Sequence, residues 1–230
     1  EQYRMPPAWL PGLLDACARR GIEFMTTTYL PEDIERVVAY VQRFKIASFE
    51  AEDYNFVTAH RAYGKPIIVS HGLSHGLTPD AINLHCVSAY PTPLDEANLA
   101  LIRDGYDGFS DHTANVLTGA FAVCAGARVL EVHIKDWATS KHNPDAGVAL
   151  DPGQFAEYVR MVRLAETMLG SGERRQSVSE AEMAQYEVRS LRCGPRRWMM
   201  PSGCWRGGTT RLPARTLSRR SRSARTITCD

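Results

Sequence analysis

The sequence predicts an α/β fold built on a parallel sheet, namely an incomplete (β/α)8 TIM barrel of about six strand–helix units. Short apolar stretches typical of buried strands alternate with segments of helical periodicity. Polar residues follow most of these strands at their C-terminal ends, where parallel α/β folds bind their ligands. No Gly-x-Gly-x-x-Gly motif is present, which disfavours an open dinucleotide-binding sheet. A full barrel needs roughly 250 residues, so we expect two units to be missing from an organised part that ends near Gly170.

The predicted elements follow one another in the order that this fold requires. Pro31 suits the first turn of a helix, because its missing N–H would be unpaired there anyway. Asp151 is the expected N-cap of the last helix, whose apolar stripe is predicted as Phe155, Val159, Val162 and Leu169. Strands are expected at residues 23–27, 44–48, 66–70, 82–88, 109–112 and 129–134, and helices at 9–20, 31–41, 54–63, 94–103, 116–127 and 152–169.

The connection between the third and fourth predicted strands is unusually short. Only residues 73–81 link them, whereas a crossover between parallel strands usually needs a dozen or more residues and contains a helix. We therefore interpret this connection as the site of an internal deletion.

Composition indicates an ordinary globular protein. The chain is 44% hydrophobic and 23% charged, which excludes a disordered or fibrous class. The six cysteines form no Cys-x-x-Cys pair, so a reducing, cytoplasmic location is expected. The longest apolar run, residues 116–127, is too short for a membrane span, and the N-terminus has no signal-peptide pattern.

The C-terminal segment differs sharply from the rest of the chain. Residues 192–230 contain ten Arg, no Lys and one acidic residue, so they carry a charge of +9 and leave −8 for the body. The acidic body argues against nucleic-acid binding. We expect a partial barrel domain at 1–170, a linker at 171–191 and a basic, disordered tail at 192–230, since the tail lacks apolar periodicity. Out-of-frame translation and a basic binding arm are the two interpretations of this tail.

Two histidine motifs form the candidate metal site. Ser110 precedes His112 by two positions, and Glu131 precedes His133 in the same way. Side chains two apart on a strand share a face, so both pairs are predicted to meet at the C-terminal ends of neighbouring strands. Two imidazoles and a carboxylate suit a divalent metal.

At this point the sequence resembles the sialic acid synthases, that is, N-acetylneuraminate synthases and their relatives. The resemblance covers roughly residues 6–191 and rests on several segments in the family's order: Lys45-Ile-Ala-Ser48 with Glu50, Lys65-Pro66 through Ser70, His85-Cys86 with Tyr90-Pro-Thr-Pro93, Ser110-Asp-His-Thr113, Gly126-Ala127 with Glu131-x-His133, and Asn143-Pro-Asp145.

The resemblance implies a TIM barrel enzyme that condenses phosphoenolpyruvate with an open-chain 2-acetamido sugar such as N-acetylmannosamine, using Mn²⁺ or Mg²⁺. A homodimer is also implied, with no nucleic-acid or membrane partner. His112 and His133 would be the metal ligands, Glu50 and Glu131 the catalytic carboxylates, and Tyr90 and Asp145 would face the sugar. The phosphoenolpyruvate site would comprise Thr27, Lys45, Ser48, Ser70, Ser88 and Ser110.

The sequence leaves several alternatives open. A legionaminic or pseudaminic acid synthase would use the same residues on a different amino sugar. A metal-dependent TIM barrel aldolase or hydrolase would share the histidine pair but would not need the Lys45 and serine shell. A third possibility is an inactive, truncated product, because two strand–helix units of the family barrel are expected to be missing.

Overall fold

The computed structural model describes residues 5–74, 76–186 and 227–229, which fall into two compact units. The first unit holds the described residues up to Gly170 together with 227–229, and the second holds residues 171–186. The second unit comprises the short helix α6 (Val178–Met183) and the 3-10 turn η4 (Ala184–Tyr186). No helix in these described ranges is long and apolar enough to cross a membrane.

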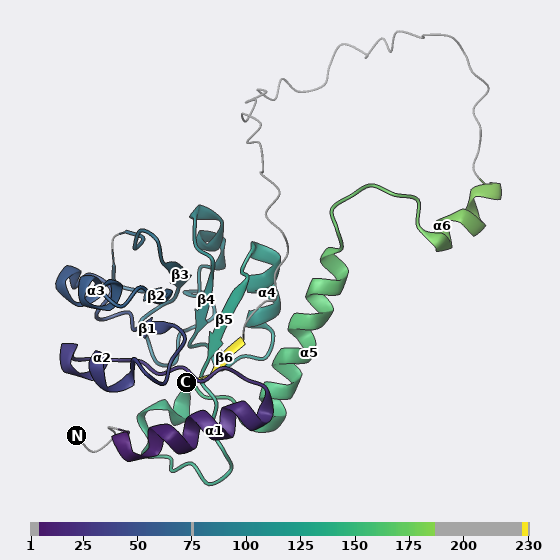
Figure 1. Cartoon of the computed structure of the whole chain (residues 1–230). Helices are drawn as coiled ribbons and strands as arrows, with labels where there is room; N and C mark the ends of the chain where they lie inside the picture. The colour runs from purple at the N-terminus through teal and green to yellow at the C-terminus, as the bar shows by residue number, and fades with distance from the viewer. Residues whose placement is uncertain (1–4, 75, 187–226, 230) are drawn as a thin grey trace. The chain divides into compact units, whose positions relative to one another are not determined.

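The first unit is built on a parallel sheet, as predicted, which has six strands in the order β1-β2-β3-β4-β5-β6 (Figure 1). Five of these strands were predicted, whereas β6 was not. Helices α2 and α3 lie beside β1 and β2, whereas α4 and α5 lie beside β4 and β5 (Figure 1). The strands are β1 (Phe44–Ile46), β2 (Ile67–His71), β3 (Ile82–His85), β4 (Gly108–Asp111), β5 (Val129–Val132) and β6 (Ile227–Cys229). The helices of this unit are α1 (Leu10–Arg20), α2 (Pro31–Val37), α3 (Tyr54–Arg61), α4 (Thr118–Ala125) and α5 (Pro152–Leu169), with 3-10 turns η1 (Pro7–Trp9), η2 (Leu99–Asp104) and η3 (Pro144–Gly147).

Helix ends follow the sequence signals. Pro31 occupies the first turn of α2. Asp151 caps α5 in a full capping box, because its side chain accepts from Gln154 N while the Gln154 side chain accepts from Asp151 N. The predicted stripe of α5 is wrong in part: Tyr158, Val162 and Ala165 form its buried face, whereas Leu169 is exposed. The buried residues of α5 follow the helical period of 3.6 residues that the sequence predicted, but Tyr158 is among them and was not predicted.

Three predicted elements differ from the observed ones. Residues 23–27 form no strand, because the segment makes a single bridge between Thr27 and Lys45 at the edge of the sheet. The helix expected at 94–103 is replaced by η2, since Asn98 adopts a left-handed conformation with φ 41° that interrupts an α-helix. The predicted strand 82–88 ends at His85.

The tail prediction is also wrong at one point. Residues 227–229 form β6, which pairs in parallel with β5, whereas a disordered tail was expected. An edge strand such as β5 offers unpaired backbone groups, and Ile-Thr-Cys contains the β-branched residues that suit a strand. Residues 192–226 and 230 lie outside the described part of the chain, so the rest of the tail prediction stays a prediction.

The two faces of the sheet carry different chemistry. On the outer face, the side chains of β1 and β2 pack with α2 and α3 in one apolar cluster, and those of β4 and β5 pack with α4 and α5 in another. α4 and α5 approach closely at Gly119, where a Cβ atom would lie 2.3 Å from the ring of Tyr158. Because successive side chains of a strand point to opposite faces, the polar residues next to these apolar ones lie on the inner face. They are Lys45, Ser70, Ser110 and Glu131.

The short connection between β2 and β3 contains no helix among its described residues. A polar cluster takes the place of that helix on the outer face. Asn83 Nδ2 donates to the carbonyl oxygens of Thr78 and Ala81, and Asn83 Oδ1 accepts from Thr78 N and His71 Nε2. These bonds use every polar atom of the buried Asn83 side chain, so the loop is closed by hydrogen bonds rather than by apolar packing.

Candidate active site

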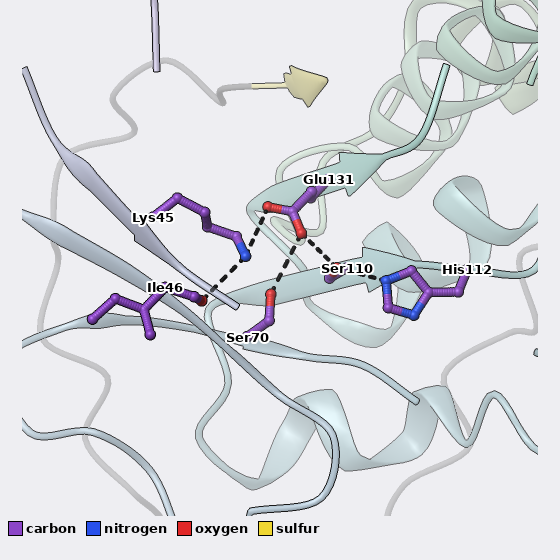
Figure 2. Close-up of polar contacts among 6 residues, drawn as sticks. All are labelled: Lys45, Ile46, Ser70, Ser110, His112 and Glu131. Atoms are coloured by element: carbon purple, nitrogen blue, oxygen red, sulfur yellow. Dashed lines mark hydrogen bonds and ion pairs between the residues drawn. The ribbon is translucent and has the colours of Figure 1, made fainter. Parts of the chain in front are cut away.

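Four buried polar side chains from four strands meet on the inner face of the sheet (Figure 2). Lys45 Nζ lies 3.3 Å from Glu131 Oε2, and Ser110 Oγ donates to Glu131 Oε1 at 2.6 Å. Ser70 Oγ lies 3.4 Å from the same Oε1 atom. Ser110 and Glu131 are register partners on β4 and β5, so the parallel ladder itself brings them side by side.

The Lys45–Glu131 ion pair is buried, since each residue is only 2% exposed. Lys45 Nζ also donates to the carbonyl oxygen of Ile46 at 3.2 Å. Glu131 Oε2 faces Lys45 but accepts no hydrogen bond of good geometry from any described residue. Burying a charge pair with unused hydrogen-bonding capacity costs stability, and such an arrangement is typical of a site that binds a ligand.

The two predicted metal ligands lie close together. The ring centroids of His112 and His133 are 5.3 Å apart. His112 Nδ1 lies 2.7 Å from the carbonyl oxygen of Val87, which can only accept, so Nδ1 carries the proton and Nε2 has the free lone pair. Ser110 Oγ lies 3.4 Å from that Nε2 but has its short hydrogen bond to Glu131. Burial lowers the pKa of His112, which favours the neutral form that ligates metals.

The expected metal site lacks a third protein ligand. A backbone carbonyl that fixes the tautomer of a histidine, as that of Val87 does for His112, is a common feature of metal ligands. The carboxylate expected beside the two imidazoles does not join them, because among the described residues no group of three or more His, Cys, Asp or Glu side chains could hold a metal ion. His112 and His133 would supply two protein ligands, one fewer than the three of typical catalytic zinc sites.

A small cavity of about 60 Å³ opens above these residues. It is lined by nine of the predicted site residues together with Tyr29 and Ala47, which the sequence analysis missed. Tyr29 follows Thr27 by two positions, so strand alternation could have identified it. The nine predicted residues are Thr27, Lys45, Ser48, Ser70, Tyr90, Ser110, His112, Glu131 and His133.

Tyr90 forms one wall of the cavity. Its ring stacks on His112 with centroids 4.3 Å apart and meets His133 edge-on at 6.0 Å. Burial raises the pKa of Tyr90 to about 12, so its hydroxyl stays protonated at neutral pH. An aromatic ring beside a polar pocket suits the apolar face of a bound sugar.

Three predicted residues do not line the cavity. Ser88 lies behind it and hydrogen-bonds Ser48, with their Oγ atoms 2.8 Å apart. Asp145 belongs to η3 and lines a neighbouring hollow of about 200 Å³, with Oδ1 3.9 Å from His133 Nδ1. Glu50 lies in the turn after β1, where burial raises its pKa while the nearby Lys45 lowers it. Its Oε2 is buried and unpaired among the described residues.

The other five histidines of the sequence were not predicted to be site residues. His60, His71 and His85 are buried, and each hydrogen-bonds protein atoms outside the cavity. His142 is exposed, and His75 lies outside the described residues.

Comparison with known proteins agrees with this geometry. The model of the NeuB family matches residues 1–174. The chain is 34% identical over 197 residues to a pseudaminic acid synthase of Campylobacter jejuni, covering 75% of this chain and 56% of that protein. It is 30% identical to the N,N'-diacetyllegionaminic acid synthase of Legionella pneumophila (74% and 54% covered) and 33% identical to the N-acetylneuraminate-9-phosphate synthase of Mus musculus (66% and 45%). The chain thus spans about half the length of these relatives.

The fold is that of the sialic acid synthase barrel. The structure superposes on the N-acetylneuraminic acid synthetase of Leptospira borgpetersenii with a TM-score of 0.71 at 23% identity, covering 80% of this chain and 70% of that one. The predicted fold class, a partial TIM barrel of this type, is confirmed. Fold, motif order and sequence similarity agree, and the chain belongs to the NeuB family of sialic acid synthases.

Proposed function

We propose that this chain carries the phosphoenolpyruvate and metal half of the active site of a nonulosonic acid synthase. The reaction condenses phosphoenolpyruvate with a 2-acetamido sugar aldehyde and releases phosphate. Support comes from the relatives, which are named pseudaminic acid synthase, N,N'-diacetyllegionaminic acid synthase and N-acetylneuraminate-9-phosphate synthase. Since these relatives make different sugar acids, the proposal covers 2-acetamido sugars as a class, N-acetylmannosamine included.

Lys45 and the hydroxyl groups would hold the phosphoenolpyruvate anion. A lysine ammonium is a compact charge with three hydrogen-bond donors. Lys45 Nζ contacts the carbonyl oxygen of Ile46 and the carboxylate of Glu131. Hydroxyls of Thr27, Ser48, Ser70 and Ser110 line the same cavity. Charge-assisted hydrogen bonds from such donors are roughly twice as strong as neutral ones, so a phosphate or carboxylate is the ligand that this set favours.

His112 and His133 would hold a divalent metal, Mn²⁺ or Mg²⁺. When bound, the metal would supply Lewis acidity toward the aldehyde oxygen of the sugar. The stacked ring of Tyr90 excludes water from one side of the His112 imidazole and keeps its orientation fixed. Asp145, whose Oδ1 lies 3.9 Å from His133 Nδ1, would orient a sugar hydroxyl.

Glu131 and Glu50 would stabilise the developing positive charge and accept the proton of the attacking water, respectively. Attack by C3 of the enol leaves positive charge at C2, and the buried carboxylate of Glu131 stabilises such charge electrostatically. Water then adds at C2 and must lose a proton to a base. Glu50, whose pKa is raised by burial, is a stronger base than an exposed carboxylate and is our candidate for this step, which it would have to reach from the turn after β1, outside the cavity lining. Ser110, donating to Glu131, keeps that carboxylate in position.

The observation that carries the proposal is the inner-face network of Lys45, Glu131, Ser110 and His112. Both Glu131 and His112 line the cavity, and their Oε2 and Nε2 atoms have only long contacts among the described residues, 3.3 Å to Lys45 Nζ and 3.4 Å to Ser110 Oγ. A hydrolase does not need a lysine that binds an anion next to a pair of histidines, whereas this condensation does.

The test is a pair of binding measurements. Calorimetric titration in the presence of Mn²⁺ should show binding of phosphoenolpyruvate and at least about tenfold weaker binding of pyruvate, which lacks the phosphate that Lys45 and the hydroxyls hold. Electron paramagnetic resonance should show Mn²⁺ uptake that His112→Ala and His133→Ala each remove, and that weakens at acidic pH because imidazolium cannot ligate a metal. Equal affinity for both anions, or full Mn²⁺ uptake in both variants, would contradict the proposal.

A further inference from the structure

The wall of the cavity formed by Thr27 and Tyr29 has little backbone support. Both residues line the cavity, and among the described residues their segment forms one isolated β-bridge to the sheet, from Thr27 to Lys45. Ladder hydrogen bonds are what fix a strand in a sheet, so the position of this segment also depends on its side-chain contacts. One of these is the ion pair between Glu23 and Arg43, and another is made by Thr28.

Thr28, between them, points the opposite way and is only 1% exposed. Its Oγ1 lies 2.6 Å from Nε2 of His60, which belongs to α3 on the outer face and is fully buried. His60 Nδ1 lies 2.8 Å from the carbonyl oxygen of Phe56, which can only accept. Nδ1 therefore carries the proton, Nε2 is the acceptor, and the Thr28 hydroxyl donates to it.

The His60 ring is itself held rigidly. Phe44 of β1 and Phe56 of α3 contact it edge-on, with ring centroids 4.9 Å and 4.5 Å away. The start of α3 is fixed because Asp53 caps it by accepting from Phe56 N. Burial also lowers the pKa of His60, which keeps the ring neutral and its Nε2 an acceptor.

We propose that Thr28 and His60 are a positioning pair that holds Thr27 and Tyr29 against the cavity from behind the sheet and so sets the affinity for the anionic substrate. This inference rests on the proposed function, since the anion meant is phosphoenolpyruvate. The pair touches no substrate. It acts through the backbone of residues 27 to 29, because the buried hydrogen bond of Thr28 restrains the chain between the two residues that line the cavity.

The substitution Thr28→Val tests the pair, because it keeps the size and β-branching of the side chain and removes only the hydroxyl. We expect it to weaken phosphoenolpyruvate binding by about tenfold, as misplacement of a positioning group by even 1 Å has large effects. Mn²⁺ affinity should stay within about twofold, because His112 and His133 lie on other strands. Thr28→Ser, which keeps the hydroxyl, should restore most of the affinity. Thr58→Val, on an exposed position of α3, is the matched control.

The outcomes separate the two ideas. If Thr28→Val loses phosphoenolpyruvate affinity and Mn²⁺ affinity in equal measure, the role of the pair is merely structural and the inference is overturned. Unchanged phosphoenolpyruvate binding in Thr28→Val would also overturn it. Absence of phosphoenolpyruvate binding by the wild type would instead overturn the proposed function. In that case amide hydrogen exchange still decides on the pair, because exchange at residues 26–30 should be faster in Thr28→Val and unchanged in Thr58→Val.

Discussion

Strand β2 separates two buried polar networks that differ in one respect. On the outer face, His71, Ser74, Thr78 and Asn83 close the short loop to β3, and each polar atom of the Asn83 side chain is hydrogen-bonded. On the inner face, Ser70 joins Lys45, Ser110 and Glu131 beside a cavity, and Glu131 Oε2 accepts no hydrogen bond from the described chain. The outer network is complete without a ligand, and the inner one is not.

The difference teaches how to separate a structural polar cluster from a functional one. A buried polar group costs free energy unless it is paired. A fully paired cluster can therefore stabilise the fold, as the outer network does in place of a helix. An incompletely paired cluster costs stability, and it is retained where a ligand completes it. The two networks should respond in opposite ways to mutation.

The largest effect is expected from Asn83→Ala in the outer network. The substitution removes four hydrogen bonds and leaves buried atoms of Thr78 and His71 unpaired. We expect a loss of about 3 kcal/mol in the free energy of unfolding, measured by urea denaturation. Phosphoenolpyruvate affinity of the folded fraction should change by less than about twofold, since the cluster faces away from the cavity. A large loss of affinity with unchanged stability would reverse the assignment of the two faces.

A smaller effect is expected from Gly72→Ala, which reaches the inner network from the loop after β2. A Cβ atom at Gly72 would lie 2.1 Å from Ser88 Oγ and 3.1 Å from Ser88 N. Ser88 must then move and release its hydrogen bond to Ser48, which lines the cavity. We expect phosphoenolpyruvate affinity to fall by roughly threefold to tenfold. Gly76→Ala is the control, because nothing lies within 4 Å of a Cβ there, and an equal loss in both variants would contradict this role.

The smallest effect concerns pH and the buried histidines of the outer face. Burial lowers the pKa of His60, His71 and His85 below the ordinary value of 6.5. The unfolded chain then binds more protons than the folded one, so stability rises with pH and is lost as the pH falls below about 6.5. Buried carboxyls act in the opposite sense at lower pH, since burial raises the pKa of Glu50 and Asp111.

Urea denaturation at about pH 7.5 and about pH 5.5 measures this effect. Replacing His85 by Asn should reduce the loss between the two pH values, whereas replacing the exposed His142 by Gln should leave it unchanged. Stability that increases on acidification across this range would show that the buried histidines are not neutral in the fold.

Much of the inner face could be predicted from the sequence. Strand alternation and the common edge of parallel strands are enough to bring Ser110, His112, Glu131 and His133 together, and the structure places all four at one cavity. Strict alternation would put Lys45 and Ser48 on opposite faces of a strand, but β1 ends at Ile46, and both residues line the cavity. The roles of these residues in binding and catalysis stay predictions.

The outer face could not be predicted in the same way. The short connection 73–81 was recognised, but nothing in its spacing indicated that Asn83 and His71 would replace a missing helix. Such a network depends on loop geometry rather than on periodicity. Thr28 and His60 were missed for a related reason, since they are 32 residues apart and meet only when α3 packs on the sheet. Periodicity predicts which face a residue occupies, but not its partner on that face.

The most direct test of the contrast between the two networks compares one substitution made on each face. Ser110→Ala removes the hydroxyl that donates to Glu131, and Ser74→Ala removes the hydroxyl bonded to His71. Each variant is measured by phosphoenolpyruvate titration with Mn²⁺ present and by urea denaturation. We expect Ser110→Ala to lose about tenfold in affinity and less than about 1 kcal/mol in stability, and Ser74→Ala to lose about 1 kcal/mol with its affinity unchanged. Equal affinity losses in the two variants, or none in Ser110→Ala, would contradict the assignment of the inner network to ligand binding.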